Sequence, residues 1–357
     1  MALAELTVQD LRCIETAELT FGPGTTLVYG ANGAGKTSIL EAIYVLGRGR
    51  SFRTRLNERL IRHGQGLCRV VGRVAHPLGT HPLGVEVRKG SDQRSATAGR
   101  LNGNPIRSLS ELALAFPTQI IDPDAHKLIE ESATRRRRWL DWAVFHVEPG
   151  FASAWSRYQR ALLQRNAALK SGSAPVAIWD EELAREGETL TSARERVLTA
   201  LLPYWSEMVE ELVGLEVSLG FSPGWDRSAS LSDALIAHTN RDRDRRTTTV
   251  GPHRADISVR VKGRAAREVL SRGQQKLAAV TLNLCQLEFL KQEHDLRPTV
   301  LLDDPSAELD HSRLARFIGR VRRLDTQIVV TALEKDFRLF GEPENLFHVE
   351  QGRVFRV

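Results

Sequence analysis

The chain reads Gly30-Ala31-Asn32-Gly33-Ala34-Gly35-Lys36-Thr37 close to its N-terminus, and this stretch fills the pattern G-x-x-x-x-G-K-[ST] of a phosphate-binding loop. A strand-like run, Thr25–Tyr29, precedes it, and apolar residues recur at helical spacing from Ile39 to Leu46. The glycines allow the backbone to curl around an oxyanion, and the helix that begins there adds the positive end of its dipole. The flanking strand and helix argue against the alternative, a glycine-rich turn with a chance lysine. The stretch therefore predicts a nucleotide-binding domain of the α/β class.

The residues of this loop have distinct expected roles. Lys36 places its ammonium between the β- and γ-phosphates, which makes it a candidate catalytic residue, and the Thr37 hydroxyl holds Mg²⁺. ATP and Mg²⁺ are therefore the expected cofactors. The candidate nucleotide-binding residues of the loop are Gly30, Ala31, Asn32, Gly33, Ala34, Gly35, Lys36, Thr37 and Ser38.

An acidic element later in the chain supplies the expected partner of the loop. The buried-strand run Thr299–Leu302 is followed by Asp303 and Asp304, the arrangement called Walker B. At the carboxyl end of a strand Asp303 can reach the Mg²⁺ held by Thr37, and Asp304 can polarise the attacking water as a candidate catalytic residue. The alternative is a pair of acids that cap a strand in a turn, and the phosphate loop upstream makes it the weaker one.

The composition is that of a globular protein. Of the 357 residues, 41% are hydrophobic and 26% are charged, and a formal net charge of +6 suggests a polyanionic partner. No apolar run is long enough to span a membrane, and the N-terminus lacks the layout of a signal peptide. We therefore expect a cytoplasmic protein with no membrane partner. The 3 cysteines form no C-x-x-C pair, so neither a disulfide framework nor a zinc site is expected.

Two stretches are rich in arginine. Residues Gly47–Arg55 are basic and punctuated by glycine, and they can form either a solvated face or a contact to a nucleic-acid phosphate backbone. The run Arg135–Arg138 lies in a helical region, where four consecutive side chains cannot all face one way. Some of these arginines are therefore expected to be solvated or to contact another chain.

The order of elements predicts two parts. Short strand-like pieces between 67 and 104 predict an antiparallel sheet, and the pattern becomes helical from 123 to 212. Two apolar stripes in this region, separated by a reversal signal at Lys170–Pro175, predict an antiparallel helical hairpin whose second helix bends or ends at Pro203. We expect residues 1–122 and 213–357 to form the nucleotide-binding head and residues 123–212 to form an inserted helical arm.

A second anion-directed helix end is expected at Leu270-Ser271-Arg272-Gly273-Gln274-Gln275-Lys276, where Ser271 is a candidate N-cap of a long amphipathic helix. This stretch resembles the signature motif of the ABC ATPases, with Arg272 in place of the first glycine. In that superfamily the signature serine and glycine touch the γ-phosphate bound by the other protomer. The resemblance implies a homodimer that encloses ATP, with Ser271, Gly273 and Gln274 as nucleotide-binding residues.

Three further positions match this superfamily in part. The stretch Pro305–Asp310 resembles the D-loop. Gln119 is a candidate for the Q-loop glutamine, although it does not follow its strand. Thr331 stands where the superfamily usually has a switch histidine, which argues against ordinary histidine-assisted hydrolysis.

Four stretches, in the same order along the chain, resemble the RecF family, the recombination mediators of bacteria. They are Tyr29–Arg53, Thr249–Arg254, Leu270–Lys276 and Leu301–Asp310. The resemblance implies an SMC-like ABC-type ATPase head with mixed and antiparallel sheets, plus a short inserted helical arm. It also implies ATP-dependent dimerisation on DNA and, with RecO and RecR, recombinase loading at gaps during DNA replication, repair and the SOS response. Duplex, gapped and junction DNA all stay open as the DNA ligand.

Two other functions are open at this point. A transporter motor subunit has the same loops, but Lys36 and Ser271 are 235 positions apart (271 − 36), a longer insert than such motors use. A clamp that binds ATP and hardly hydrolyses it is favoured by Asp304, whose side chain is one methylene shorter than the glutamate of many relatives. Because misplacing a catalytic group by about 1 Å can cost on the order of 10²-fold in rate, we expect at most a weak, DNA-dependent ATPase.

Overall fold

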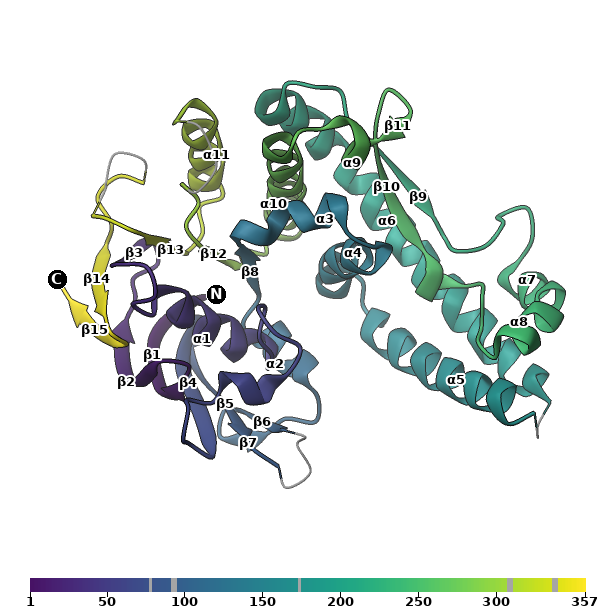
Figure 1. Ribbon diagram of the computed structural model, residues 1–357, viewed down its shortest axis with the longest axis horizontal. Coiled ribbons are helices and arrows are strands. Elements are labelled where there is room, and N and C mark those ends of the chain that lie inside the picture. The colour runs from purple at the N-terminus through teal and green to yellow at the C-terminus, as the bar shows by residue number, and fades with distance from the viewer. Residues whose placement is uncertain (77–78, 91–94, 173–174, 307–310, 336–339) are drawn as a thin grey trace. The chain divides into compact units, whose positions relative to one another are not determined.

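The computed structural model describes residues 1–76, 79–90, 95–172, 175–306, 311–335 and 340–357. Packing divides the chain into two compact units, one formed by Met1–Ala125 with Asp295–Val357 and the other by His126–His294. Figure 1 shows the helices and strands of each unit. No helix within the described ranges combines the length and the apolar composition that crossing a bilayer requires.

The first unit contains an antiparallel sheet, whose six described strands follow the order β2-β1-β4-β5-β6-β7. Buried and exposed residues alternate along β4, because one face of the sheet packs on the core and the other meets water. The antiparallel sheet predicted between 67 and 104 is confirmed. The strands are β1 (Ala2–Leu11), β2 (Ile14–Thr20), β4 (Leu67–His76), β5 (Gly79–Arg88), β6 (Ala96–Leu101) and β7 (Asn104–Pro105).

A second sheet in this unit collects strands from both ends of the chain, and its six described strands follow the order β15-β14-β3-β13-β12-β8. Neighbours from β14 to β8 are parallel, and β15 is antiparallel to β14. The strands are β3 (Thr25–Tyr29), β8 (Thr118–Ile121), β12 (Thr299–Leu302), β13 (Ile328–Ala332), β14 (Asn345–Glu350) and β15 (Arg353–Arg356). The carboxyl ends of β3, β13 and β12 therefore meet at one edge, where ligands of open α/β sheets bind.

Helix α1 (Lys36–Arg48) packs into the core that the two sheets share. Its Ile43 belongs to one buried cluster with Val70 of the antiparallel sheet and Val329 of the parallel sheet. The helix ends at Gly49, whose φ of 64° lies in the left-handed region that favours glycine. The other described helices and 3-10 turns of this unit are α2 (Leu109–Ala115), α11 (His311–Arg323) and η1 (Asn57–Leu60), with η2 (Pro123–His126) at the boundary.

The second unit is mainly helical, and its consecutive long helices α5 (Phe151–Ser171) and α6 (Asp180–Val213) pack along each other. The predicted hairpin is thereby confirmed, and residues 173–174 of its predicted reversal lie outside the described residues. The remaining helices and turns are α3 (Lys127–Glu130), α4 (Ala133–Val147), η3 (Val176–Trp179), α7 (Leu231–Ala237), α8 (Thr239–Arg245), η4 (Pro252–Arg254), α9 (Ala266–Val269) and α10 (Arg272–His294). A small antiparallel sheet completes the unit, with β9 (Ser218–Ser222), β10 (Asp256–Val261) and β11 (Arg264–Ala265).

Helix α6 does not end at Pro203, which lies inside it. The flanking side chains Leu201 and Trp205 are buried, and the Trp205 indole Nε1 donates to the Val217 carbonyl oxygen at 2.5 Å. Burying two such large side chains contributes roughly 3 to 6 kcal/mol, which offsets the ~3 kcal/mol that a proline costs inside a helix.

Residues 213–294 pack with the helical region, although we expected them to belong to the head. Helix α10 packs on α6, and β10 packs on α4, so these residues fall into the same compact unit as the hairpin. The boundary after Ala125 lies close to the predicted one after residue 122. The division into a functional head and arm stays a prediction.

Two fully buried arginines connect the helices of the second unit. Arg165 donates to Asp180 Oδ1 and to Asp242 Oδ2, both at 2.6 Å. Arg194 donates to the two carboxylate oxygens of Asp141 at 2.7 and 2.9 Å. Since a buried charge is tolerated only when it is paired, these contacts constrain how α4, α5, α6 and α8 pack.

We expect Arg194→Ala to lower the free energy of unfolding by about 3 to 5 kcal/mol, because it leaves the Asp141 carboxylate without its partner. The matched control is Arg196→Ala in the same helix. Arg196 pairs with Glu148 at 2.8 Å, but its side chain is 60% exposed, so its loss costs less than about 1 kcal/mol. Urea unfolding followed by tryptophan fluorescence measures both variants. Equal losses would mean that burial does not set the cost of removing these two arginines.

Candidate nucleotide-binding site

The predicted phosphate loop connects β3 to α1, as the strand, loop and helix pattern of the sequence predicted. Two of its glycines leave little room for a side chain. A Cβ at Gly30 would lie 2.2 Å from the Val349 carbonyl oxygen, and one at Gly35 would lie 3.0 Å from the Cys13 sulfur. Both glycines also have positive φ angles, 153° and 119°. The loop is therefore held in its curled shape by close packing.

The Lys36 ammonium folds back over this loop. Its Nζ donates to the carbonyl oxygen of Gly30 at 2.6 Å and to that of Ala31 at 3.0 Å. The pKa of Lys36 lies below its ordinary value because burial lowers it by more than the carboxylates of Asp304 and Asp303 raise it. A cation at the start of a helix suits the binding of a polyphosphate.

The fold joins Thr37 and Asp303 across 266 positions of sequence. The Thr37 hydroxyl donates to the carboxylate, with Oγ1 3.0 Å from Oδ1 and 3.1 Å from Oδ2. The pKa of Asp303 lies above its ordinary value because burial raises it by more than the hydrogen bonds from Thr331 and Thr37 lower it. A hydroxyl and a carboxylate are the hard oxygen ligands that Mg²⁺ prefers, so these residues fit the predicted metal.

Asp304, the predicted catalytic acid, follows in a half-buried position with a left-handed backbone, φ 44°. Its carboxylate accepts from the Ser306 hydroxyl at 2.8 Å, and its N–H donates to Thr331 Oγ1 at 2.9 Å. One carboxylate oxygen of Asp304 is thus engaged by its own loop. Residues 307–310 of the predicted D-loop lie outside the described residues.

Gln119, the candidate Q-loop residue, lies inside β8 and pairs in register with Val300. The strand continues to Ile121, whose carbonyl oxygen accepts from the Asp303 N–H at 3.0 Å at the carboxyl edge of the sheet. Gln119 therefore lies in the middle of a strand, and the structure does not bring it to the edge where Thr37 and Asp303 meet.

The signature stretch begins α10, and Ser271 caps this helix as predicted. Ser271 N–H donates to Gln274 Oε1 at 3.0 Å, and Gln274 N–H donates to Ser271 Oγ at 3.4 Å. These reciprocal bonds form a capping box. Around Gly273, in the first turn, an added Cβ would meet nothing within 4 Å. The contact of Ser271, Gly273 and Gln274 with a nucleotide stays a prediction.

Glu41 is a fully buried carboxylate in α1 that no sequence motif indicates. It accepts from Arg12 Nε and Nη2 at 2.8 and 2.7 Å, and from the Ser51 hydroxyl. Ser51 Oγ in turn accepts from the N–H groups of Arg53 and Thr54 at 2.9 and 3.0 Å. The basic stretch after α1 is therefore held against the helix by a buried charge. In the sequence, this acid could not be told apart from one on a solvated helix face.

We expect Glu41→Ala to lower the free energy of unfolding by about 3 kcal/mol, the lower end of the cost of breaking a buried ion pair, because the arginines around it keep some access to water. Glu15→Ala is the control, since Glu15 is 77% exposed and lies 3.7 Å from Arg62. Its expected loss is below about 1 kcal/mol. Chemical unfolding of both variants tests this difference. A Glu41→Ala variant with an unchanged free energy of unfolding would contradict it.

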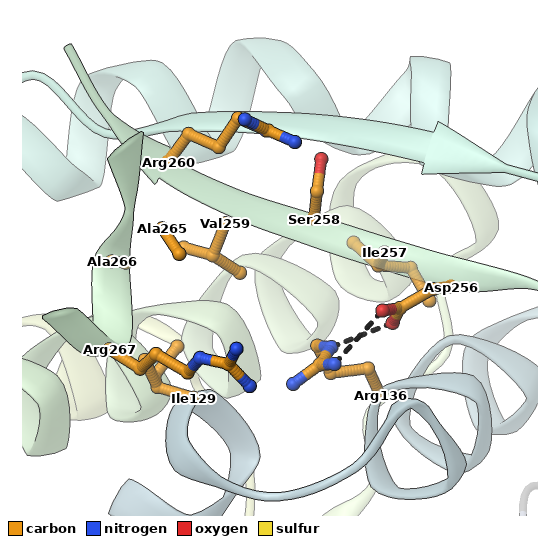
Figure 2. A pocket seen from close by; sticks show the side chains of 10 residues that line it. All are labelled: Ile129, Arg136, Asp256, Ile257, Ser258, Val259, Arg260, Ala265, Ala266 and Arg267. Carbon is orange, nitrogen blue, oxygen red and sulfur yellow. Dashed lines mark hydrogen bonds and ion pairs between the residues drawn. The ribbon is translucent and has the colours of Figure 1, made fainter. Parts of the chain in front are cut away.

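The arginine run at 135–138 begins α4 and largely serves the fold of the second unit. Arg136 donates to both carboxylate oxygens of Asp256 at 2.8 and 3.0 Å, and Figure 2 shows this pair beside a cavity. Arg137 donates to the Ala255 carbonyl oxygen at 2.6 Å. Among the described residues that line the cavity, none belongs to the predicted nucleotide site. Arg136 and Arg137 are therefore explained by partners within their own chain.

The motif Thr249–Arg254 also has a structural explanation. His253 Nδ1 lies 2.6 Å from the Tyr158 hydroxyl, and Nε2 lies 3.1 Å from the Thr248 carbonyl oxygen. Burial lowers the pKa of His253 to about 4, so the ring is neutral at pH 7. Its Nε2–H then donates a hydrogen bond to the Thr248 carbonyl oxygen. The motif thus joins α5 to the segment before β10.

The geometry defines a class of protein. The first unit has the three features of an ABC-type ATPase head. They are a phosphate loop between β3 and α1, acids at the end of the parallel strand β12, and an antiparallel sheet on the same core. Residues 2–353 match the family described as "RecF/RecN/SMC N terminal domain". The chain belongs to the RecF family within that group, as the resemblance predicted. This membership separates it from the transporter motor subunits.

Relatives named "DNA replication and repair protein RecF" match the chain along its whole length. The protein of Pseudomonas syringae pv. tomato is 38% identical over 363 residues, covering 99% of this chain and 98% of the relative. The protein of Stenotrophomonas maltophilia is 40% identical over 370 residues and covers 100% of both.

Solved structures agree with the fold. The structure of the recombination mediator protein RecF-ATP in the RecFOR pathway has a TM-score of 0.89 at 27% identity, and the match covers 100% of this chain and 97% of that one. A SmcHead bound to the C-winged helix domain of ScpA matches with a TM-score of 0.62 at 18% identity, over 100% and 97% of the two chains. The latter supports the fold alone. The predicted SMC-like ABC ATPase fold is confirmed.

Proposed function

We propose that this chain is an ATP-dependent recombination mediator that binds DNA in replication and repair, acting in the cytoplasm as a homodimer with ATP and Mg²⁺. The observation that carries the proposal is the hydrogen-bonded pair of Thr37 and Asp303 next to Lys36, in a chain of the RecF family. A RecF of the RecFOR pathway was solved with ATP. By this likeness RecO and RecR are the expected partners.

Within one subunit, the first unit of the chain supplies the phosphate and metal ligands. The Lys36 ammonium compensates phosphate charge, and N–H groups of the loop and of the first turn of α1 supply further donors to the phosphates. Thr37 and Asp303 would hold Mg²⁺, which would supply positive charge against the phosphates. Asp304 orients the attacking water.

The second subunit completes the site through the start of its α10. The capping box of Ser271 and Gln274 orders this helix end, and the positive end of the helix dipole favours an anion there. The open space at Gly273 leaves the backbone accessible to a phosphate. These features support a γ-phosphate contact from the partner subunit, so that ATP holds the dimer together.

Hydrolysis is expected to be slow, and two features favour ATP acting mainly as a clamp. The Asp304 carboxylate is short and accepts from Ser306, and position 331 carries threonine in place of a switch histidine. The second candidate function is a scaffold that binds ATP between two subunits and does not hydrolyse it. A steady release of phosphate that depends on DNA and on Asp304 would exclude it.

The composite site predicts different losses for two variants. Lys36→Ala should abolish ATP binding and dimerisation together, because the phosphates lose their charge partner in cis. Ser271→Ala should leave ATP binding intact and block the ATP-driven dimer. Binding of labelled ATP and light scattering with ATP, with ADP and with neither measure both effects.

The control for these variants is Ser230→Ala, which removes the side-chain cap of α7. Ser230 Oγ accepts from the Asp233 N–H at 3.1 Å, so this change costs about 1 kcal/mol of capping, as Ser271→Ala does. It should keep the ATP-driven dimer. Equal loss of nucleotide binding in the Lys36 and Ser271 variants would contradict the composite site.

DNA binding should depend steeply on salt. Helix α11 carries five arginines and no acidic residue among His311–Arg323, and the chain has a net charge of +6. Contacts to duplex phosphates predict a log-log slope of about −0.9 for each phosphate neutralised. Fluorescence anisotropy with duplex, gapped and junction DNA across a salt series measures it. A binding constant indifferent to salt would exclude a phosphate interface.

A further inference from the structure

Thr331 lies beside the Walker B acids because of the strand register. Strands β12 and β13 are parallel neighbours, with Leu302 opposite Val330. The next residues of the two strands, Asp303 and Thr331, therefore meet at the carboxyl edge of the sheet. In the ABC ATPase superfamily that the sequence resembles, this position usually carries a histidine.

The Thr331 hydroxyl uses both of its hydrogen-bonding roles on the two acids. Its Oγ1 donates to Asp303 Oδ1 at 2.9 Å and accepts from the Asp304 N–H at 2.9 Å. The side chain is fully buried. A hydroxyl has a single proton to donate, so Thr331 cannot donate to a nucleotide while it holds Asp303.

These bonds restrain both acids. The Asp303 Oδ1 that accepts from Thr331 also accepts from Thr37 Oγ1 at 3.0 Å, so two hydroxyls orient one metal-binding carboxylate. At Asp304, the bond to Thr331 anchors the N–H of a residue whose φ of 44° is uncommon for any residue other than glycine. The direction in which the Asp304 side chain leaves the backbone therefore depends on Thr331.

We propose that Thr331 is a positioning residue that joins Asp303 and Asp304 into one preset unit and acts on the nucleotide only through them. This inference rests on the proposed ATP function. It assigns to position 331 a role different from the nucleotide contact of a switch histidine. Position 331 then affects turnover and the part of the ATP affinity that depends on Mg²⁺. The ATP affinity without Mg²⁺ depends on Lys36 and the phosphate loop.

Thr331→Val tests the inference, because valine keeps the shape and removes the hydroxyl. ATP affinity is measured with Mg²⁺ and with EDTA, and turnover is measured as phosphate release. In EDTA the variant should bind ATP within about twofold of the unmodified chain. The gain in affinity on adding Mg²⁺, and the turnover, should fall about tenfold to a hundredfold, the usual effect of losing a hydrogen bond to a charged group.

Three further variants separate positioning from packing. Thr331→Ser keeps the hydroxyl and should retain most of the Mg²⁺ gain. Thr331→Ala removes it without adding volume, so the Ala and Ser variants decide the test if the Val variant does not fold. The matched control is Thr26→Val, since Thr26 is fully buried in β3 of the same sheet and its hydroxyl has no hydrogen-bond partner among the described residues. It should behave as the unmodified chain.

The outcomes distinguish this inference from the proposed function. If the unmodified chain binds no ATP, both are wrong. If it binds ATP with a Mg²⁺ gain that Thr331→Val and Thr331→Ala keep, only the role of Thr331 is overturned. If Thr331→Ser loses as much as Thr331→Ala, the residue acts by its shape and the positioning role is overturned. The positioning role is supported if Thr331→Ser keeps the Mg²⁺ gain in ATP affinity and Thr331→Val and Thr331→Ala lose it.

Discussion

The nucleotide site depends on one carboxylate, that of Asp303, which accepts hydrogen bonds from Thr37 and from Thr331. Thr37 follows β3, Thr331 is part of β13, and Asp303 follows β12, so this meeting requires the order β3-β13-β12 in the parallel sheet. The Asp303 side chain is buried, with the residue only 9% exposed. A buried charge must be satisfied by hydrogen bonds or by a cation. The sheet therefore places a buried carboxylate where the proposed Mg²⁺ would lie, and Lys36 adds a cation beside it that suits the proposed phosphates.

The starts of α1 and α10 differ in a way that suits their proposed roles. At α1 the N-cap is Gly35, which offers no side-chain hydrogen bond, so no capping side chain competes with a phosphate for the N–H groups of the first turn. At α10 the Ser271 and Gln274 side chains bond back to the backbone. These bonds order the helix end within a single chain, which would lower the entropy lost on forming the proposed dimer interface. The first helix end thus suits the phosphate site proposed within a subunit, and the second suits the contact proposed with a partner subunit.

Charge in the second unit mostly builds the fold. Arg165 and Arg194 are fully buried, and their carboxylate partners lie on other segments of the unit. Arg136 pairs with Asp256 in the same manner. An arginine-rich sequence is therefore weak evidence for a nucleic-acid contact, because a guanidinium with five donors serves equally well as a link between helices.

The sequence by itself determined the features that depend on neighbours along the chain. These are the phosphate loop, the acids after β12, the Ser271 cap and the helical hairpin, since spacing, caps and periodicity act over a few residues. Only the tertiary structure decided the roles of Glu41, Thr331 and Arg136, and it placed Gln119 in the middle of a strand. It also packed residues 213–294 with the hairpin. The physical reason is that a polar side chain takes its role from the groups that meet it, and those groups come from distant parts of the chain.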